Sequence, residues 1–171
     1  SAGIVTSDGK QFRVHRGMGL VSQVFNGELL HGLVGNMAVG HTRYSTTGSS
    51  HLRNAQPLTV DCARGQIAIA HNGNLTNASQ LREELEADGS IFQTTVDSEI
   101  ILHLMARPTQ SGENNLIQAL RRIEGAFSLV ILTEQELIGV RDPYGFRPLS
   151  LGKVGDAWVL ASETCAFDLI H

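Results

Sequence analysis

Residues 67–74 read IAIAHNGN, an apolar run that ends abruptly in a polar segment built around Asn72-Gly73. The apolar half predicts a strand over residues 66–70, and the Asn-Gly pair is a strong signal for a turn because both residues tolerate positive φ. A turn there would place the side-chain amide of Asn72 and an exposed backbone N–H at the same strand end. Two such donors that point at one oxygen make an oxyanion hole. Turn chemistry alone would also explain the pair.

The rest of the chain predicts antiparallel sheets with helices on their faces. Residues 7–10 (SDGK) predict a hairpin between the first two strands, Asn77 with Gln80 is typical of a capping box, and Gly89 ends that helix. The pattern does not separate a helix–sheet–sheet–helix sandwich from a single-sheet α+β fold. The remaining predicted strands are 2–6, 11–15, 37–42, 58–62, 126–133, 136–141 and 158–161, and the predicted helices are 78–87, 98–106 and 115–123.

Composition limits the class of protein. The 171 residues fit one domain. A net charge of −4 with only 13 scattered Lys and Arg indicates no basic patch that would bind nucleic acid. No apolar run approaches the ~18 residues that span a bilayer, so we expect no membrane partner. The two cysteines, Cys62 and Cys165, suggest no disulfide framework and fit a reducing, cytoplasmic location.

Several polar segments accompany Asn72-Gly73 in a fixed order: 40–46 (GHTRYST), 54–58 (NAQPL), 93–99 (QTTVDSE), 141–149 (RDPYGFRPL) and 161–168 (ASETCAFD). Together they resemble the class II glutamine amidotransferase domain of the amidophosphoribosyltransferase family, whose members open purine biosynthesis. The resemblance covers residues 1–171 as a single domain. It implies an α+β fold, the four-layer αββα sandwich of the N-terminal nucleophile hydrolases, with antiparallel sheets and the first strand missing.

The family's nucleophile is a cysteine at the mature N-terminus, and by the resemblance this chain begins after that segment. Cys62 and Cys165 stand at the wrong places to replace it. Ser1 is an N-terminal hydroxyl beside its own α-amine, a known nucleophile arrangement, but the resemblance places it in the second strand of the fold. We therefore expect the chain by itself to hydrolyse no glutamine.

A site for glutamine needs a cation for the α-carboxylate, an anion for the α-ammonium and a stabiliser for the oxyanion. Arg43 follows a predicted strand and its planar fork suits a carboxylate, although composition alone favours a surface ion pair. Asp97 precedes a predicted helix, where capping is an equally concrete role. The resemblance assigns Arg43 to the carboxylate, Asp97 to the ammonium, and Asn72 with Gly73 to the oxyanion hole. Glu99 is interpreted as first-turn charge outside the site.

The histidines follow no recognised zinc spacing, so we expect no metal site, and His71 is interpreted as support for the turn. The chain has no phosphate-binding loop of the form G-x-x-x-x-G-K-[ST]. The resemblance implies that phosphoribosyl pyrophosphate and Mg²⁺ bind a phosphoribosyltransferase domain beyond residue 171. Ammonia would pass to that domain and form phosphoribosylamine. Some family members also carry an iron–sulfur cluster on cysteines outside this segment, and we expect the full-length protein to be a homo-oligomer.

Two other interpretations stay open. One is the amidotransferase domain of a hexosamine-phosphate or asparagine synthase, against which residues 74–77 (NLTN) and 141–149 argue. The other is a degenerate, noncatalytic glutamine-binding or structural module, which would account for the missing nucleophile. A purely structural module would have no need for Arg43, Asn72, Gly73 and Asp97 together.

Overall fold

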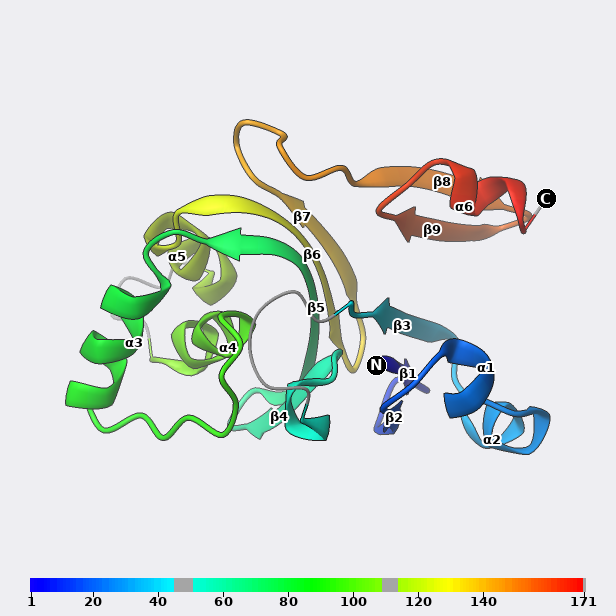
Figure 1. Cartoon of the computed structure of the whole chain (residues 1–171), viewed down its shortest axis with the longest axis horizontal. Coiled ribbons are helices and arrows are strands. Elements are labelled where there is room, and N and C mark those ends of the chain that lie inside the picture. Colours follow the sequence, from blue (N-terminus) through cyan, green and yellow to red (C-terminus); the bar gives the residue numbers. More distant parts are fainter. Residues whose placement is uncertain (45–50, 109–113, 171) are drawn as a thin grey trace.

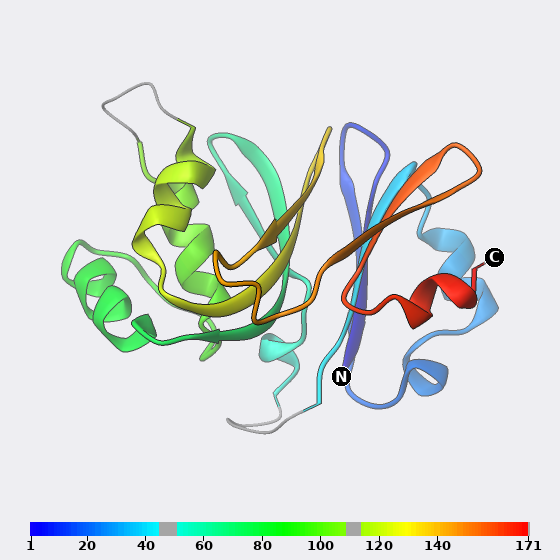
Figure 2. The ribbon, with the colours of Figure 1, turned by 90° about the horizontal axis from the view of Figure 1, so that it is seen from above.

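The computed structural model describes residues 1–44, 51–108 and 114–170; the last two residues of the family segment 40–46 fall outside these ranges. Two antiparallel sheets face each other in the middle of the molecule (Figures 1 and 2). Helices from the centre of the chain cover the outer face of one sheet. Short helices from the beginning and the end of the chain lie on the opposite side (Figure 2).

The first sheet has three antiparallel strands in the order β2-β1-β3, namely β1 (Ala2–Ser7), β2 (Phe12–Gly17) and β3 (Met37–Thr42). The predicted hairpin between β1 and β2 is confirmed. The Asp8 carboxylate accepts hydrogen bonds from the backbone N–H groups of Lys10 and Gln11, at 3.0 and 3.1 Å, and Gly9 adopts a φ of +89°. The sequence pattern did not predict the two short helices that follow, α1 (Val21–Val24) and α2 (Gly27–Gly32).

The second sheet has four antiparallel strands in the order β4-β5-β6-β7, preceded by a 3₁₀ turn, η1 (Leu52–Asn54). Its strands are β4 (Leu58–Cys62), β5 (Gly65–Leu75), β6 (Gly125–Thr133) and β7 (Leu137–Arg141). β5 and β6 lie at its centre and curve together across the molecule (Figure 1).

The alternation of residues along β5 explains how both of its faces are covered. Ile67 and Ile69 belong to the core that the second sheet shares with its helices, whereas Ala68 and Ala70 pack with Val5 of the first sheet. Successive side chains of a strand point to opposite faces. The large isoleucines therefore face the helices, and the small alanines allow the two sheets to approach. This packing shows that the fold is a sandwich of two sheets and not a single-sheet α+β fold.

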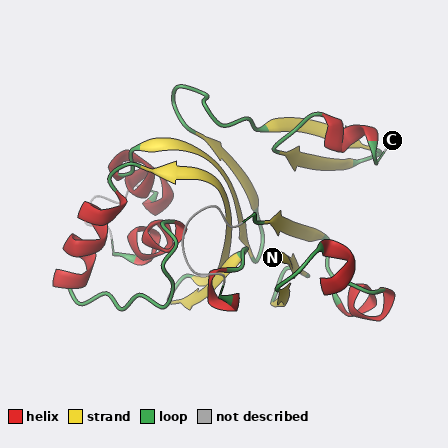
Figure 3. Ribbon diagram, viewed as in Figure 1, coloured by secondary structure: helices red, strands yellow, loops and turns green. Residues whose placement is uncertain are grey.

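The helix layer consists of α3 (Ala78–Ala87), α4 (Ser98–Ala106) and α5 (Asn115–Arg122), the red helices on the left of Figure 3. The predicted bounds of α3 and α4 are confirmed, but the capping box is wrong. The Asn77 side chain makes no cap bond. It donates instead to the carbonyl of Arg122 at 2.8 Å and accepts from the N–H of Glu124 at 3.0 Å, so it ties the start of α3 to the end of α5.

Glu99 in the first turn of α4 does more than complement the helix dipole. Its side chain is only 8% exposed, and its two oxygens accept hydrogen bonds from the backbone N–H groups of Gln93 and Thr94 at 2.8 and 2.7 Å. Glu99 therefore holds the segment that leads into α4, and it does not line the large cavity described below.

The chain ends in a separate hairpin of β8 (Ser150–Val154) and β9 (Ala157–Ala161), followed by α6 (Cys165–Asp168). Only β9 was predicted, because β8 carries a glycine and a lysine among half-exposed residues and gives no clean alternation. The architecture is the α+β sandwich with antiparallel sheets that the resemblance implies. No helix in the described ranges is long and apolar enough to cross a membrane.

Candidate functional site

A cavity of about 1240 Å³ lies between the two sheets and the start of α4. Its wall includes residues of β1, the end of β3, β5 and β6, together with the residues before α4, part of the α1–α2 region and the C-terminal hairpin. The four residues assigned to a glutamine site, Arg43, Asn72, Gly73 and Asp97, all line it. Ligand cavities typically measure about 300–1,000 Å³, so an amino acid has ample room here. The structure therefore brings the four predicted residues to one cavity.

The prediction of a turn at Asn72-Gly73 is wrong, since β5 continues to Leu75 and pairs with β6 from Ile67 to Leu75. Gly73 still has a φ of +142°, and a Cβ on it would lie 2.1 Å from the carbonyl oxygen of Ala126 on β6. The glycine is required by this close approach of two backbones. The local sequence does not reveal the partner strand, so the pair resembled a hairpin turn.

The side chain of Asn72 is held by a residue that sequence reasoning missed. Nη2 of Arg147 donates a hydrogen bond to Oδ1 of Asn72. Arg147 follows β7, lines the same cavity and belongs to the family segment 141–149. The two residues stand 75 positions apart, and nothing in the local pattern connects them.

Asp97 immediately precedes α4 but makes no side-chain cap bond to it. One carboxylate oxygen accepts the backbone N–H of Leu75 at 2.9 Å, and the other lies 3.2 Å from Nδ1 of His71. Burial acts to raise the pKa of Asp97, but the hydrogen bond and charge of His71, together with backbone donors, outweigh it and lower the pKa. Asp97 is therefore an ionised carboxylate on the cavity wall, beside the end of β5.

His71 connects the strand to the carboxylate. Its backbone N–H donates to Oε1 of Gln56 at 2.7 Å, and its Nδ1 lies 3.2 Å from both Asp97 and the hydroxyl of Ser98. The ring is buried, and within the described part of the chain its Nε2 has no hydrogen-bond partner. A proton on Nδ1 satisfies Asp97, so the ring supports the carboxylate and not a turn.

Arg43 directly follows β3, as expected. Its backbone N–H donates to the carbonyl of Ser1 at 2.8 Å, and the nitrogen of Ser1 donates to the carbonyl of Arg43 at 3.0 Å. Burial, with the charges of His71 and Arg43, lowers the pKa of the neighbouring His41 to about 4, so His41 is neutral at pH 7. The charged groups of the predicted site are thus a guanidinium at Arg43 and a carboxylate at Asp97.

Neither cysteine lines this cavity. Cys62 is half-buried at the end of β4, and Cys165 is exposed at the start of α6. Within the described ranges, no group of three or more His, Cys, Asp or Glu side chains gathers in a way that would hold a metal ion.

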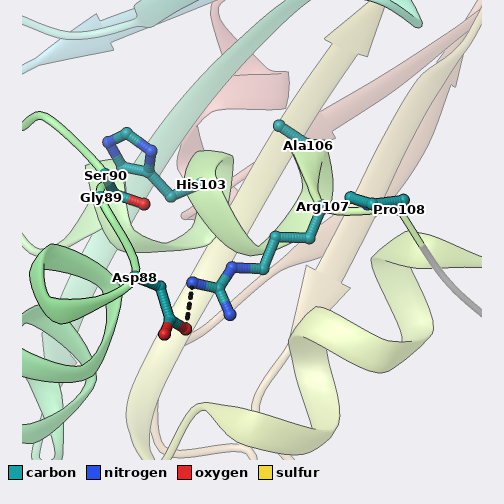
Figure 4. A pocket seen from close by; sticks show the side chains of 7 residues that line it. All are labelled: Asp88, Gly89, Ser90, His103, Ala106, Arg107 and Pro108. Atoms are coloured by element: carbon teal, nitrogen blue, oxygen red, sulfur yellow. Dashed lines mark hydrogen bonds and ion pairs between the residues drawn. The ribbon is translucent and has the colours of Figure 1, made fainter.

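A second cavity, of about 540 Å³, opens where α3 and α4 end (Figure 4). An ion pair between Asp88 and Arg107, 2.8 Å long, crosses its mouth. Both side chains are more than a third exposed, at 61% for Asp88 and 35% for Arg107, so the pair is solvated and its charges are already matched. None of the four predicted site residues lies in this cavity.

Comparison with known proteins identifies the family. Residues 41–168 match the model of the glutamine amidotransferase domain. The amidophosphoribosyltransferases of Methanothermobacter thermautotrophicus and Bacillus subtilis are 48% and 46% identical to the chain over 99% of its residues. The chain spans only 36% of the length of each.

Solved structures agree with the sequence relatives. The glutamine phosphoribosylpyrophosphate amidotransferase from B. subtilis, complexed with ADP and GMP, superposes with a TM-score of 0.90 at 44% identity, over 99% of this chain and 37% of its own. A structure described as the allosteric regulatory enzyme of purine biosynthesis gives a TM-score of 0.92 at 45% identity, with the same coverage. The cavity with its four residues, the fold and these similarities lead to one conclusion: the chain belongs to the glutamine amidotransferase domain family.

Proposed function

We propose that this chain is the glutaminase half of an amidophosphoribosyltransferase. It hydrolyses glutamine to glutamate and ammonia, and the ammonia reacts with phosphoribosyl pyrophosphate to give 5-phosphoribosylamine, the first step of de novo purine biosynthesis. The observation that carries the proposal is the single cavity whose wall holds Arg43, Asn72, Gly73 and Asp97. The names of the relatives favour this enzyme over a hexosamine-phosphate or asparagine synthase.

In this proposal the two charged ends of glutamine bind opposite charges on the wall. The guanidinium of Arg43 receives the α-carboxylate, because its planar donors match two carboxylate oxygens. Asp97 receives the α-ammonium. Its carboxylate is already anchored by the N–H of Leu75 and by His71, and a carboxylate has about four lone-pair sites, so it retains acceptor capacity for the substrate.

The chemical step is an attack by a thiolate on the side-chain carbonyl carbon of glutamine. Negative charge develops on the carbonyl oxygen, where the side-chain amide of Asn72 and the N–H of Gly73 stabilise it. The carbon–nitrogen bond then breaks, the nitrogen takes up a proton and leaves as ammonia, and water hydrolyses the remaining thioester to glutamate. The thiolate is proposed to come from an N-terminal cysteine outside residues 1–171, with its own α-amine as the base.

The remaining parts of the enzyme are likewise proposals. Phosphoribosyl pyrophosphate and Mg²⁺ are assigned to a phosphoribosyltransferase domain outside this chain, as is the iron–sulfur cluster of some family members. A homo-oligomeric state and a cytoplasmic location stay predictions of the resemblance and the composition.

The test uses the complete enzyme that contains these residues. Arg43→Lys and Asp97→Asn should each raise the KM for glutamine at least tenfold, because loss of one partner of a desolvated charge contact costs about 2–5 kcal/mol. Synthesis from added ammonia should survive, since ammonia does not need the glutamine site. Equal loss of both activities would contradict the assignment.

The chain offers a matched control at the second cavity. Arg107→Lys and Asp88→Asn make the same chemical changes in an exposed ion pair (Figure 4), and such pairs contribute only about 0–1 kcal/mol. These two variants should keep the wild-type KM for glutamine. A comparable rise in KM would show that the effect is not specific to the large cavity.

A further inference from the structure

The orientation of the Asn72 amide is decided by its neighbour. A guanidinium has donors and no acceptor, so the amide atom that faces Nη2 of Arg147 is the oxygen. This argument holds even though the oxygen and nitrogen of an amide are hard to tell apart by position. The NH₂ group of Asn72 is therefore turned away from Arg147. Both residues line the cavity, and the described residues provide no hydrogen-bond acceptor for that NH₂ group.

Arg147 is itself fixed on the sheet that carries Asn72. The carboxylate of Asp142, buried to 3% exposure, accepts backbone N–H groups from Phe127 on β6 and from Tyr144, Phe146 and Arg147 in the loop, at 3.0–3.3 Å. The N–H of Asp142 donates in turn to the carbonyl of Phe127 at 2.8 Å. These hydrogen bonds hold the loop against β6. Ser128, the residue of β6 that follows Phe127, stands opposite Asn72.

The Asp142 carboxylate that holds the loop is ionised at neutral pH. Burial acts to raise the pKa of Asp142, but the backbone N–H groups of Arg147, Phe146, Phe127 and Tyr144 outweigh it and lower the pKa. The carboxylate stays ionised at neutral pH and holds the loop.

A second observation shows that Arg147 is not placed for its own hydrogen bonding. Its Nε is buried and has no partner among the described residues. Buried donors without partners are rare and unfavourable in folded proteins, so the position of this guanidinium is not the one that best satisfies it. It is the position that reaches the Asn72 oxygen.

We propose that Arg147 is a positioning residue for the oxyanion hole. It fixes the side-chain rotamer of Asn72 and the directions in which the amide oxygen and the NH₂ group point, so that the NH₂ group faces the reacting oxygen. The charge of Arg147 also polarises the amide, so that its N–H becomes a better donor. This inference rests on the proposed glutaminase function, and it adds Arg147, with Asp142 behind it, to a site otherwise formed by Arg43, Asn72, Gly73 and Asp97.

Kinetics in the complete enzyme test the role. Arg147→Met removes the donors and the charge but keeps an unbranched side chain. Its kcat with glutamine should fall about 10- to 100-fold with little change in KM, because misplacing a group by about 1 Å costs on the order of 10²-fold. Arg147→Lys should recover part of kcat. Ammonia-dependent synthesis should be unchanged, and so should both activities of Arg141→Met, a nearby exposed arginine.

A double variant separates positioning from a general effect. Once Asn72→Ala has removed the amide, there is nothing left for Arg147 to orient, so Asn72→Ala with Arg147→Met should be no slower than Asn72→Ala alone. Losses that multiply would overturn the proposal. A change confined to KM, or an equal loss of the ammonia-dependent activity, would also overturn it.

A spectroscopic test needs no turnover and uses the complete enzyme, labelled with ¹⁵N only at asparagine. The side-chain amide signal of Asn72 in a ¹⁵N–¹H correlation spectrum is identified by its disappearance in Asn72→Ala. It should shift in Arg147→Met and stay in place in Arg141→Met. An unmoved signal in Arg147→Met overturns the proposal whatever the kinetics. A shifted signal with normal kcat in Asn72→Ala would keep the contact but reject the glutaminase function, so the two failures are distinguishable.

Discussion

Gly73→Ala is the substitution whose effect on stability can be worked out most directly from the structure. An added Cβ would lie 2.1 Å from the carbonyl oxygen of Ala126 and 2.8 Å from Cα of Phe127. Both contacts are with the backbone of β6, so no side chain can rotate away. The two central strands would have to separate by about 1 Å locally, and close-packed interiors resist such shifts.

Two costs add in this variant. A non-glycine residue at a φ of +142° costs about 1–3 kcal/mol in backbone strain. Overpacking between two buried strands costs about a further 1–3 kcal/mol. We therefore expect the free energy of unfolding to fall by about 2–6 kcal/mol, a large part of the 5–15 kcal/mol typical of a domain.

Gly9→Ala and Gly125→Ala are matched controls for urea denaturation of the same chain. Gly9 also has a positive φ, of +89°, but a Cβ there meets nothing within 4 Å, so only the strain remains. Gly125 shares the φ of +142° and would place its Cβ 2.3 Å from the carbonyl of Asn74, so its loss should match that of Gly73→Ala. If Gly73→Ala proved no less stable than Gly9→Ala, the close-approach explanation of the glycine would be wrong.

Three further predictions concern the site. In the complete enzyme, Asn72→Ala should lower the glutamine-dependent kcat by about 10²–10³ with a smaller change in KM, because the oxyanion contact strengthens as charge develops. Steady-state kinetics in which only KM changes would reject the role of Asn72 as an oxyanion donor. Because the folded-state pKa of Asp97 lies below its unfolded value of about 3.9, the stability it provides is present above about pH 4 and is lost as the pH falls through the folded value. Urea titrations should therefore show the wild type losing its advantage over Asp97→Asn on acidification, and an advantage that grew towards acid would refute the sign. Finally, Cys62→Ser and Cys165→Ser should leave glutamine hydrolysis by the complete enzyme unchanged, since neither cysteine lines the cavity, and ammonia release measured for each variant checks this.

The sequence predicted most elements because their signals are local. Residues 67–70 are apolar on both faces, and α3 and α4 have their apolar residues at helical spacing, so their predicted positions are confirmed. The failures have one cause in common. Asn77 bonds to the last residue of α5 and to Glu124 just after it, and Gly73 packs against β6. In both cases a partner distant in sequence determines what the residue does.

In the candidate site, too, the sequence predicted the features with local signals and missed those that depend on partners distant in sequence. The resemblance named Arg43, Asn72, Gly73 and Asp97, and the structure brings all four to one cavity. Arg147 was missed because an arginine in an exposed-looking loop carries no local mark of a buried contact 75 positions away. Asp97 looked like a helix cap because capping is the commonest role at that position, but its carboxylate instead makes tertiary contacts with Leu75 and His71.

The placement of Asn72 within a strand also has a consequence for function. In a turn, the amide would depend on a short exposed loop for its position. Here Asn72 lies on the same face of β5 as Ala68 and Ala70, which pack between the sheets. It is also paired with Ser128 of β6. Groups on paired strands are held more precisely than groups on loops, and an oxyanion donor stabilises a transition state only if it is in place before charge develops. The run of residues 67–74 thus connects sheet packing to the position of the amide that is proposed to stabilise the oxyanion, and Arg147 is proposed to control the orientation of that amide.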